Sequence, residues 1–230
     1  MRLVFLHAAG SSGDEWVQQR LALGGAYEIA TPDLPGHGAS KDGPLQSIED
    51  MSGWIAATQD VARAVIVGHS LGAAVGIALA ASHRLRGLVL VGASPRLDVP
   101  EGFLARVSRD PAAAVERLAA SGFASGARAG LVDKASAYLA RNDPAVLAAD
   151  FRAGVAFDAT PYLSRIRVPT LVVAGAEDRL TTVEDAEAIA RGVRGAELAV
   201  IDGAGHMVML ERPREFNERV ERFLGTLDGL

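Results

Sequence analysis

The sequence predicts an α/β protein built on an open, mostly parallel β-sheet of about six strands, with helices on both faces. Three observations support this prediction. Short apolar runs of strand type recur along the chain, helical stretches separate most of them, and the runs are nearly continuous in apolarity rather than alternating. Continuous apolar strands are typical of parallel sheets covered on both faces. Strand–helix–strand repeats build such sheets through right-handed crossovers.

Turn residues bound each predicted strand, and the strands are Leu3 to Leu6, Tyr27 to Ala30, Ala64 to Val67, Gly87 to Val91, Thr170 to Ala174 and Glu197 to Ile201. Apolar residues at helical spacing predict helices at about Asp14 to Leu23, Glu49 to Asp60, Leu71 to His83, Val183 to Arg191 and Arg212 to Thr226. Together these elements alternate over most of the chain, as the predicted fold requires.

One long interval interrupts the alternation, because helical periodicity without a strand pattern continues from the fourth predicted strand to the fifth. Three prolines mark helix starts or boundaries within it: Pro111, Pro144 and Pro161. Open α/β sheets bind ligands at the carboxyl ends of their strands, and the interval leaves from such an end. We therefore predict a helical cap at residues 95–165 over a core of residues 1–94 and 166–230. An insertion without a role at the site, or a docking surface, is the alternative.

Composition bounds the possible functions. The chain has 230 residues, 49% of them hydrophobic, which suits a single α/β domain. Its net charge of −5, with both signs mixed along the chain, argues against binding to nucleic acid or to an anionic membrane. The lack of cysteine excludes disulfides and thiolate chemistry. No signal-peptide pattern and no run of roughly 20 apolar residues occurs, so we predict a cytoplasmic protein without a membrane span.

Ser70 lies at a predicted junction of strand and helix, in the pentapeptide Gly68-His69-Ser70-Leu71-Gly72. A sharp turn there strains the central residue, and it crowds the positions on either side so closely that glycine is needed. The turn exposes the serine near the positive end of the following helix. G-x-S-x-G is a known nucleophile element whose context, strand before and helix after, is predicted here. We interpret Ser70 as a nucleophile, with an ordinary N-cap serine as the alternative.

A serine hydroxyl becomes a good nucleophile when a histidine, oriented by a carboxylate, takes its proton. Two histidines follow Ser70 in the chain. His83 ends the helix that begins after the nucleophile, more than a dozen residues away, so we expect it at the surface or as a C-cap. His206 follows the last predicted strand in a glycine-rich loop that can reach back over the sheet edge. We therefore predict His206 as the base.

Three acidic residues are candidates for the orienting carboxylate. Glu177 and Asp178 follow the fifth predicted strand, and periodicity does not separate these two neighbours. Asp202, close to His206, is a weaker candidate.

The chemistry also needs two backbone N–H groups aimed at the developing oxyanion. Leu71 supplies one, because it directly follows the nucleophile. The loop after the first strand supplies the other, and Ala9 is our candidate. We expect His7 in that loop to be a structural hydrogen-bonding residue rather than a proton-transfer group.

Five motifs follow one another in order: LVFLHAAG, DLPGHGAS, GHSLG, AGAEDRL and DGAGHM. Together they resemble the α/β-hydrolase superfamily, in its compact cap-bearing, serine esterase-like branch, over nearly the whole chain. The resemblance implies that Ser70 is the nucleophile, Asp178 the orienting acid and His206 the base. A serine at this turn is similar to esterases, lipases, thioesterases, perhydrolases and carbon–carbon-bond hydrolases. It argues against the dehalogenases and epoxide hydrolases, which carry aspartate there.

The chain departs from the family pattern in two ways. Ala8 stands where relatives usually have glycine after the histidine, so the oxyanion loop can differ in shape. The chain also begins at the oxyanion strand, without the two opening strands common in the family. A short, all-parallel sheet is the expected consequence.

The predicted substrate pocket is apolar, which suits an ester of a small or medium acyl group. Leu71 and Met207 flank catalytic positions and are our pocket residues, together with Phe157. Aromatic side chains are spread over the predicted cap, and we expect most of them to pack within it: Phe103, Phe123, Tyr138, Phe151 and Phe157.

We predict a serine carboxylesterase that works through an acyl-enzyme on a small-molecule ester. The five histidines lack ligand-like spacing, so we expect no metal and no other cofactor. The alternatives are a carbon–carbon-bond hydrolase, a lyase resembling the menaquinone-pathway synthase, an acyl-carrier-protein methyl-ester esterase, and a receptor that keeps the triad to bind a small molecule. Residues 97–160 carry seven Arg or Lys against eight Asp or Glu, which gives no basic docking patch for a carrier protein. The sequence assigns neither the physiological substrate nor the oligomeric state.

Overall fold

The computed structural model describes residues 1–100 and 102–227. These residues form one six-stranded sheet in the order β2-β1-β3-β4-β5-β6, and every neighbouring pair is parallel. The strands are β1 (Arg2–Leu6), β2 (Glu28–Ala30), β3 (Val65–His69), β4 (Gly87–Val91), β5 (Thr170–Gly175) and β6 (Glu197–Ile201). The predicted fold class is confirmed, with strand boundaries that differ from the expected ones by small shifts.

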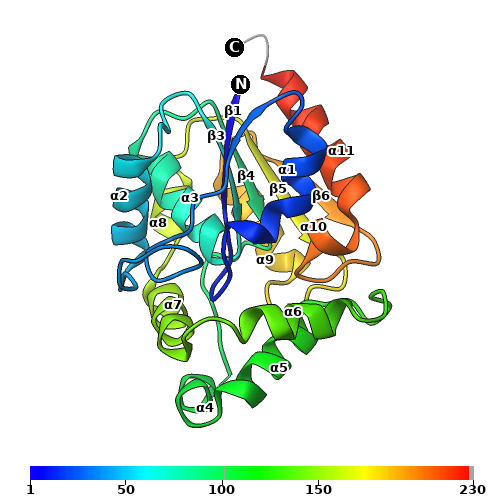
Figure 1. Ribbon diagram of the computed structural model, residues 1–230. Coiled ribbons are helices and arrows are strands. Elements are labelled where there is room, and N and C mark those ends of the chain that lie inside the picture. The colour runs from blue at the N-terminus through cyan, green and yellow to red at the C-terminus, as the bar shows by residue number, and fades with distance from the viewer. Residues whose placement is uncertain (101, 228–230) are drawn as a thin grey trace.

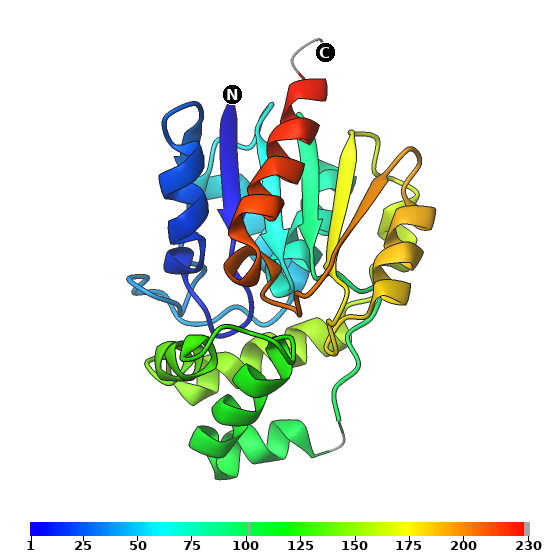
Figure 2. The same ribbon diagram turned by 90° about the vertical axis from the view of Figure 1, so that its right-hand side faces the viewer.

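Helices cover both faces of this sheet (Figure 1, Figure 2). One face carries α1 (Val17–Leu23), which follows a 3-10 turn (Gly13–Trp16), and α11 (Pro213–Thr226), which follows the short α10 (Val208–Glu211). The other face carries α2 (Ile48–Thr58), α3 (Leu71–Ser82), α8 (Thr160–Leu163) and α9 (Val183–Gly192).

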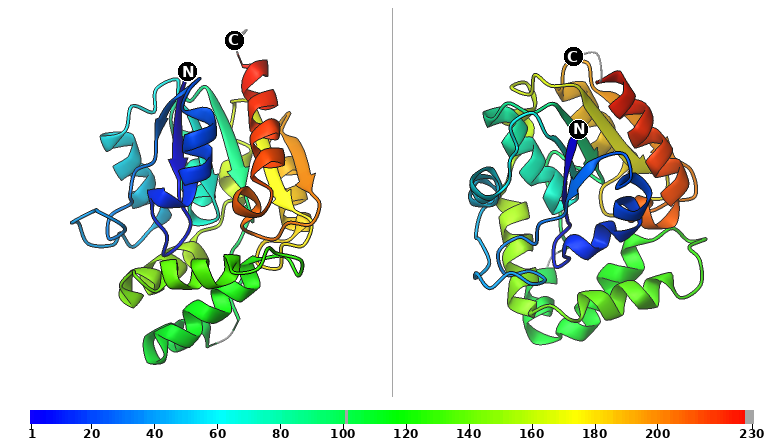
Figure 3. Two further views of the ribbon diagram at one scale, coloured as in Figure 1. Left: turned by 45° about the vertical axis from the view of Figure 1, so that its right-hand side comes forward. Right: turned by 45° about the horizontal axis from the view of Figure 1, so that its top comes forward.

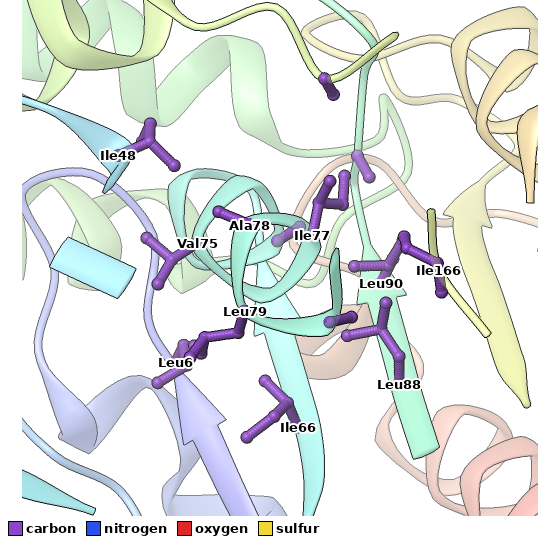
Figure 4. Packing of buried hydrophobic residues seen from close by; sticks show 14 of the residues in the cluster. Leu6, Ile48, Ile66, Val75, Ile77, Ala78, Leu79, Leu88, Leu90 and Ile166 are labelled. Carbon is purple, nitrogen blue, oxygen red and sulfur yellow. The ribbon is translucent and has the colours of Figure 1, made fainter. Parts of the chain in front are cut away.

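The central strands bury side chains on both faces, which explains their unbroken apolar sequences. In β1, Val4 and Leu6 belong to the core cluster on the α2–α3 face, whereas Leu3 and Phe5 belong to the cluster on the α1–α11 face. Burying each such side chain contributes roughly 1.5–3 kcal/mol to the hydrophobic stabilisation. Figure 4 shows α3 packed on the sheet, with these labelled side chains from both: Leu6, Ile66, Val75, Ile77, Leu79, Leu88 and Leu90.

A third group of helices lies together at the carboxyl ends of the strands (Figure 1, Figure 3). It consists of α4 (Phe103–Arg109), α5 (Pro111–Gly122), α6 (Leu131–Leu139) and α7 (Pro144–Ala156). Two of these helices begin as the sequence predicts, with proline in the first turn. An aspartate precedes each proline, and its side chain accepts a backbone N–H of the first turn, which caps the helix.

Helix α8 also lies in the predicted cap interval, but it contacts α3 and α9 beside the sheet. Among residues 1–100 and 102–227, no helix is both long and apolar enough to cross a membrane. The same residues contain no group of three or more His, Cys, Asp and Glu arranged to hold a metal ion.

Candidate active site

Ser70 occupies a strained turn between β3 and α3, with φ of 53° and ψ of −111°. The turn is so tight that a Cβ on Gly68 would lie 2.2 Å from the carbonyl oxygen of Gly72. A Cβ on Gly72 would lie 2.3 Å from that of Leu6. Real Cβ atoms do not approach this closely, so both positions require glycine. The predicted strand–turn–helix context, with its crowding, is therefore present.

The strain at Ser70 leads to a stability prediction. Glycine adopts a positive φ freely, whereas alanine keeps the strain of serine, which is about 1–3 kcal/mol in sparsely populated regions. Part of the gain is offset because glycine makes the unfolded chain more flexible. We expect Ser70→Gly to be more stable than Ser70→Ala by about 1 kcal/mol, or about 2–4 °C in Tm. Calorimetry of the two variants checks this, and a Tm for Ser70→Gly equal to or below that of Ser70→Ala would contradict the prediction.

His206 and Asp178 form a buried hydrogen-bonded pair at the same edge of the sheet. The Nδ1 of His206 lies 2.8 Å from the Oδ2 of Asp178. The other carboxylate oxygen accepts the backbone N–H groups of Leu180 and Thr181, at 2.8 and 3.0 Å. Because Nδ1 carries the proton donated to the carboxylate, Nε2 is left as the basic nitrogen.

Electrostatics make this imidazole a stronger base. Burial disfavours the protonated ring, but the Asp178 carboxylate outweighs burial and raises the pKa of His206 above its ordinary value. In the same way, burial opposes ionisation of Asp178, but His206 and the backbone donors lower the pKa of that carboxyl below its ordinary value. The pair is thus poised to hold a proton taken from a nucleophile.

Thr181 is a residue of this pair that sequence reasoning missed. Its hydroxyl donates to Oδ2 of Asp178 at 2.9 Å and lies 3.1 Å from Nδ1 of His206. The hydroxyl therefore fixes the carboxylate in the orientation that the imidazole needs. Its position three residues after a candidate acid, in a turn, is the signal that could have pointed to it.

The other sequence candidates lie elsewhere. The carboxylate of Glu177 accepts the backbone N–H and the hydroxyl of Ser125, at 3.0 and 2.8 Å. Asp202 is exposed, and His83 is an exposed C-cap of α3. Of the three acidic candidates from the sequence, Asp178 is the one that the structure places next to His206.

A second buried side-chain pair, Glu15 and His69, lies next to His206, and the sequence did not reveal it. The ring of His69 stacks near that of His206, with centroids 4.7 Å apart. Its Nδ1 lies 2.9 Å from a carboxylate oxygen of Glu15, and its Nε2 lies 3.1 Å from the carbonyl oxygen of His206. The ring of His69 thus bridges the Glu15 carboxylate and the backbone carbonyl of His206.

The carboxylate of Glu15 is buried against the ring of His69. Burial opposes ionisation of Glu15, but His69 lowers the pKa of this carboxyl below its ordinary value. Glu15 thus fixes the His69 ring, and the ring holds the backbone of the His206 loop.

The loop after β1 presents one free N–H group. Three of its four successive N–H groups are used: Ala8 donates to Glu15, Gly10 to Oδ2 of Asp150 at 2.8 Å, and Ser11 to the carbonyl of Ala8 at 3.2 Å. The N–H of Ala9 has no acceptor within the described chain. Neither has the N–H of Leu71, the first residue of α3. Ala9 lies with Ser70 along the same cavity walls, as an oxyanion donor should.

Two further histidines support this loop. The Nδ1 of His7 lies 2.8 Å from the carbonyl oxygen of Ala8, and its Nε2 accepts the N–H of Leu34 at 3.1 Å. The expected structural role of His7 is confirmed. His37 lies 2.7 Å from the Asp150 carboxylate, which also holds Gly10. Although burial disfavours its charge, Asp150 raises the pKa of His37 above its ordinary value. Asp150 on α7 therefore connects this helix to the loop after β1.

Ser70 and His206 line one cavity of about 410 Å³, whose walls are mostly apolar. A smaller cavity of about 50 Å³ also reaches Ser70. Of the pocket residues predicted from sequence, Met207 lines the large cavity, whereas Leu71 and Phe157 line the small one.

Aromatic side chains from the segment that contains α4 to α7 line the large cavity. The expectation that most of them only pack among these helices is wrong, because four line this cavity: Phe103, Phe123, Tyr138 and Phe151. Within the described residues, the Ser70 hydroxyl and the His206 ring are not hydrogen-bonded to each other. Such bonds are often loose before substrate binds.

Comparison with known proteins agrees with this geometry. The model of the "Alpha/beta hydrolase family" matches residues 3–219. A putative carbamate hydrolase RutD of Rhizobium rhizogenes is 30% identical over 246 residues, covering 96% of this chain and 92% of that protein. A pimeloyl-[acyl-carrier protein] methyl ester esterase of Aromatoleum aromaticum is 30% identical, covering 93% and 94%. The solved structure of Est816, described as an N-acyl homoserine lactone degrading enzyme, is 30% identical with a TM-score of 0.86, covering 97% and 93%.

Proposed function

The chain belongs to the alpha/beta hydrolase family, and from that premise we propose that it is a serine hydrolase of carboxylic esters with small or medium acyl groups. One observation carries the proposal: a strained, glycine-flanked Ser70 shares an apolar cavity with a histidine that a buried aspartate orients. The names of the relatives, among them esterases and a carbamate hydrolase, support hydrolysis of ester-like bonds. In this proposal residues 95–165 are a cap that closes the cavity.

The proposed reaction has two halves. In the first, Nε2 of His206 takes the Ser70 proton while Oγ bonds to the carbonyl carbon of the ester. The oxyanion that forms is held by the N–H groups of Ala9 and Leu71. When it collapses, the bond from carbonyl carbon to alkoxide breaks, and His206 returns the proton to the departing alcohol.

The second half hydrolyses the acyl-enzyme. His206 takes a proton from water, whose oxygen bonds to the acyl carbon and forms the same kind of oxyanion. The bond to Ser70 then breaks, the proton passes to Oγ, and the carboxylic acid leaves. Asp178 orients the imidazole and stabilises its charged form in both halves, without itself accepting a proton. The net reaction is ester plus water giving acid plus alcohol, with no cofactor.

Labelling by an organophosphonate tests the assignment. We expect a fluorescent alkyl phosphonate to modify the protein once, at Ser70, and to stop hydrolysis of p-nitrophenyl acetate in step with labelling. Peptide mass spectrometry identifies the modified residue. Turnover that persists after complete labelling, or a label on another side chain, would contradict the proposal. Tight ester binding without turnover would instead indicate the receptor alternative.

A further inference from the structure

The two cavities that meet at Ser70 differ greatly in size, with volumes of about 410 and 50 Å³. Ala9, Ser70 and Thr181 line both of them, so the nucleophile lies where they join. An ester has two arms, the acyl group and the alcohol, which extend from its carbonyl carbon in different directions. A substrate attacked by Ser70 therefore has one spacious compartment and one narrow compartment for its two arms.

The position of His206 decides which arm enters which cavity. In the proposed reaction the leaving alkoxide must receive its proton from Nε2 of His206, so the alcohol oxygen has to lie beside this ring. His206 and its neighbour Met207 line the large cavity and do not line the small one. The alcohol arm therefore extends into the large cavity, and the small cavity remains for the acyl arm.

The narrow cavity has walls that limit its size. Phe157 is almost fully buried and packs on the ring of Tyr162, with centroids 5.1 Å apart. On α7, a Cβ added to Gly154 would lie 3.0 Å from a methyl carbon of Leu97, so little spare space remains on that side. One water-sized group needs roughly 10–15 Å³ of such a cavity, so a volume of about 50 Å³ holds a short chain of a few heavy atoms. The cavity thus accommodates a short acyl arm, of about three or four carbon atoms beyond the carbonyl.

The polar atoms of the narrow cavity restrict the class of acyl group further. Asp150 lines it, and the Oδ1 of this fully buried carboxylate has no hydrogen-bond partner among the described residues. This oxygen accepts hydrogen bonds and donates none, so a second carboxylate on the acyl chain would lose its hydration there without gaining a donor. Acyl arms that end in a second carboxylate are therefore disfavoured as well as long ones.

Resting on the proposed function, we propose that the substrates are esters of short, uncharged acyl groups, up to about butyryl in size, with bulky apolar alcohols. Each methylene that a pocket cannot accommodate changes kcat/KM by roughly 10–200-fold. We therefore expect p-nitrophenyl butyrate to exceed p-nitrophenyl octanoate in kcat/KM by at least about 100-fold, with the hexanoate between them.

A pair of constitutional isomers tests the orientation directly. Hexyl acetate and methyl heptanoate contain the same atoms and have similar hydrophobicity, but their long arms lie on opposite sides of the ester. We expect the wild-type protein to hydrolyse hexyl acetate with a kcat/KM at least about 100-fold higher, measured by proton release in a pH-stat. Equal rates, or a preference for methyl heptanoate, would overturn the proposal.

Two matched substitutions locate the preference in the structure. Phe157→Leu enlarges the narrow cavity and should lower the butyrate-to-octanoate ratio of kcat/KM at least about 5-fold. Phe103→Leu makes the same change in the wall of the large cavity and should keep that ratio within about 2-fold of wild type. These thresholds follow from the change in kcat/KM that one methylene group causes in a pocket. A ratio that changes in Phe103→Leu and not in Phe157→Leu would contradict the assignment of the acyl arm to the narrow cavity. Should Phe157→Leu fail to fold, the ester panel measured on the wild-type protein still tests the proposal.

This proposal and the proposed function fail in different ways. Phosphonate labelling of Ser70 together with a preference for long acyl arms refutes the cavity assignment and leaves the serine hydrolase intact. Esters that are hydrolysed without involvement of Ser70 refute both.

Discussion

Replacement of Ser70 by alanine is expected to lower kcat for p-nitrophenyl acetate by about 10⁶-fold, because removal of the serine in such a triad leaves no covalent route. The remaining donors and the cavity can still bind the ester, so KM should change far less than kcat. Steady-state kinetics on highly purified protein measures both kcat and KM. Phosphonate labelling of the same protein then tests whether the reactive hydroxyl has been lost. Retention of more than about a tenth of the wild-type kcat would remove Ser70 from the mechanism.

Ser108→Ala is the matched control for that variant. Ser108 is exposed on α4, and its hydroxyl donates to the carbonyl of Leu104 within the same helix. The substitution removes a serine hydroxyl, as Ser70→Ala does, but at a position that lines neither cavity. We expect wild-type kcat and full labelling in this control. A fall in activity similar to that of Ser70→Ala would show that the loss does not report on the nucleophile.

The strands could be predicted because their pattern is local and strongly apolar. Gly87–Val91, which is β4, is buried at every position, and its uninterrupted apolar sequence reflects a strand covered on both faces. At the sheet edge, β6 alternates exposed and buried residues in its last three positions, yet it remains recognisable from its turn residues and length. What the sequence could not supply was the arrangement of α4 to α7, because their packing depends on contacts between residues far apart in the chain.

The residues of the candidate site also differ in whether a local sequence pattern predicts them. Ser70 and His206 follow from motifs with fixed local geometry, the sharp turn and the glycine-rich loop. Glu15 and Asp150 do not, because nothing in a short window distinguishes a buried carboxylate from the many exposed ones. Each finds its partner at a separation of 54 or 113 residues, His69 for Glu15 and His37 for Asp150. Such pairs emerge once the fold has brought distant segments together.

Replacement of Asp178 by asparagine is expected to lower kcat by about 10⁴-fold at neutral pH. The asparagine amide can donate to Nδ1, which moves the imidazole proton to Nε2 and removes the base that faces Ser70. The pH profile of kcat/KM should change as well. In the wild-type protein the Asp178 carboxylate raises the pKa of His206, so activity falls as the pH drops through a value above about 6.5. Without that negative charge the pKa falls, and the residual activity of the variant should persist to lower pH.

Glu177→Gln separates this effect from a general change in local charge, because it makes the same chemical change at the adjacent residue. Glu177 holds Ser125 and does not contact His206, so its loss should leave both the kcat and the acid limb of the pH profile nearly unchanged. The contrast is strong because the two carboxylates are neighbours in sequence and differ in the direction they face. If Glu177→Gln impaired kcat more than Asp178→Asn, the orienting acid would have to be reassigned. If neither variant moved the acid limb, His206 would not be the titrating base.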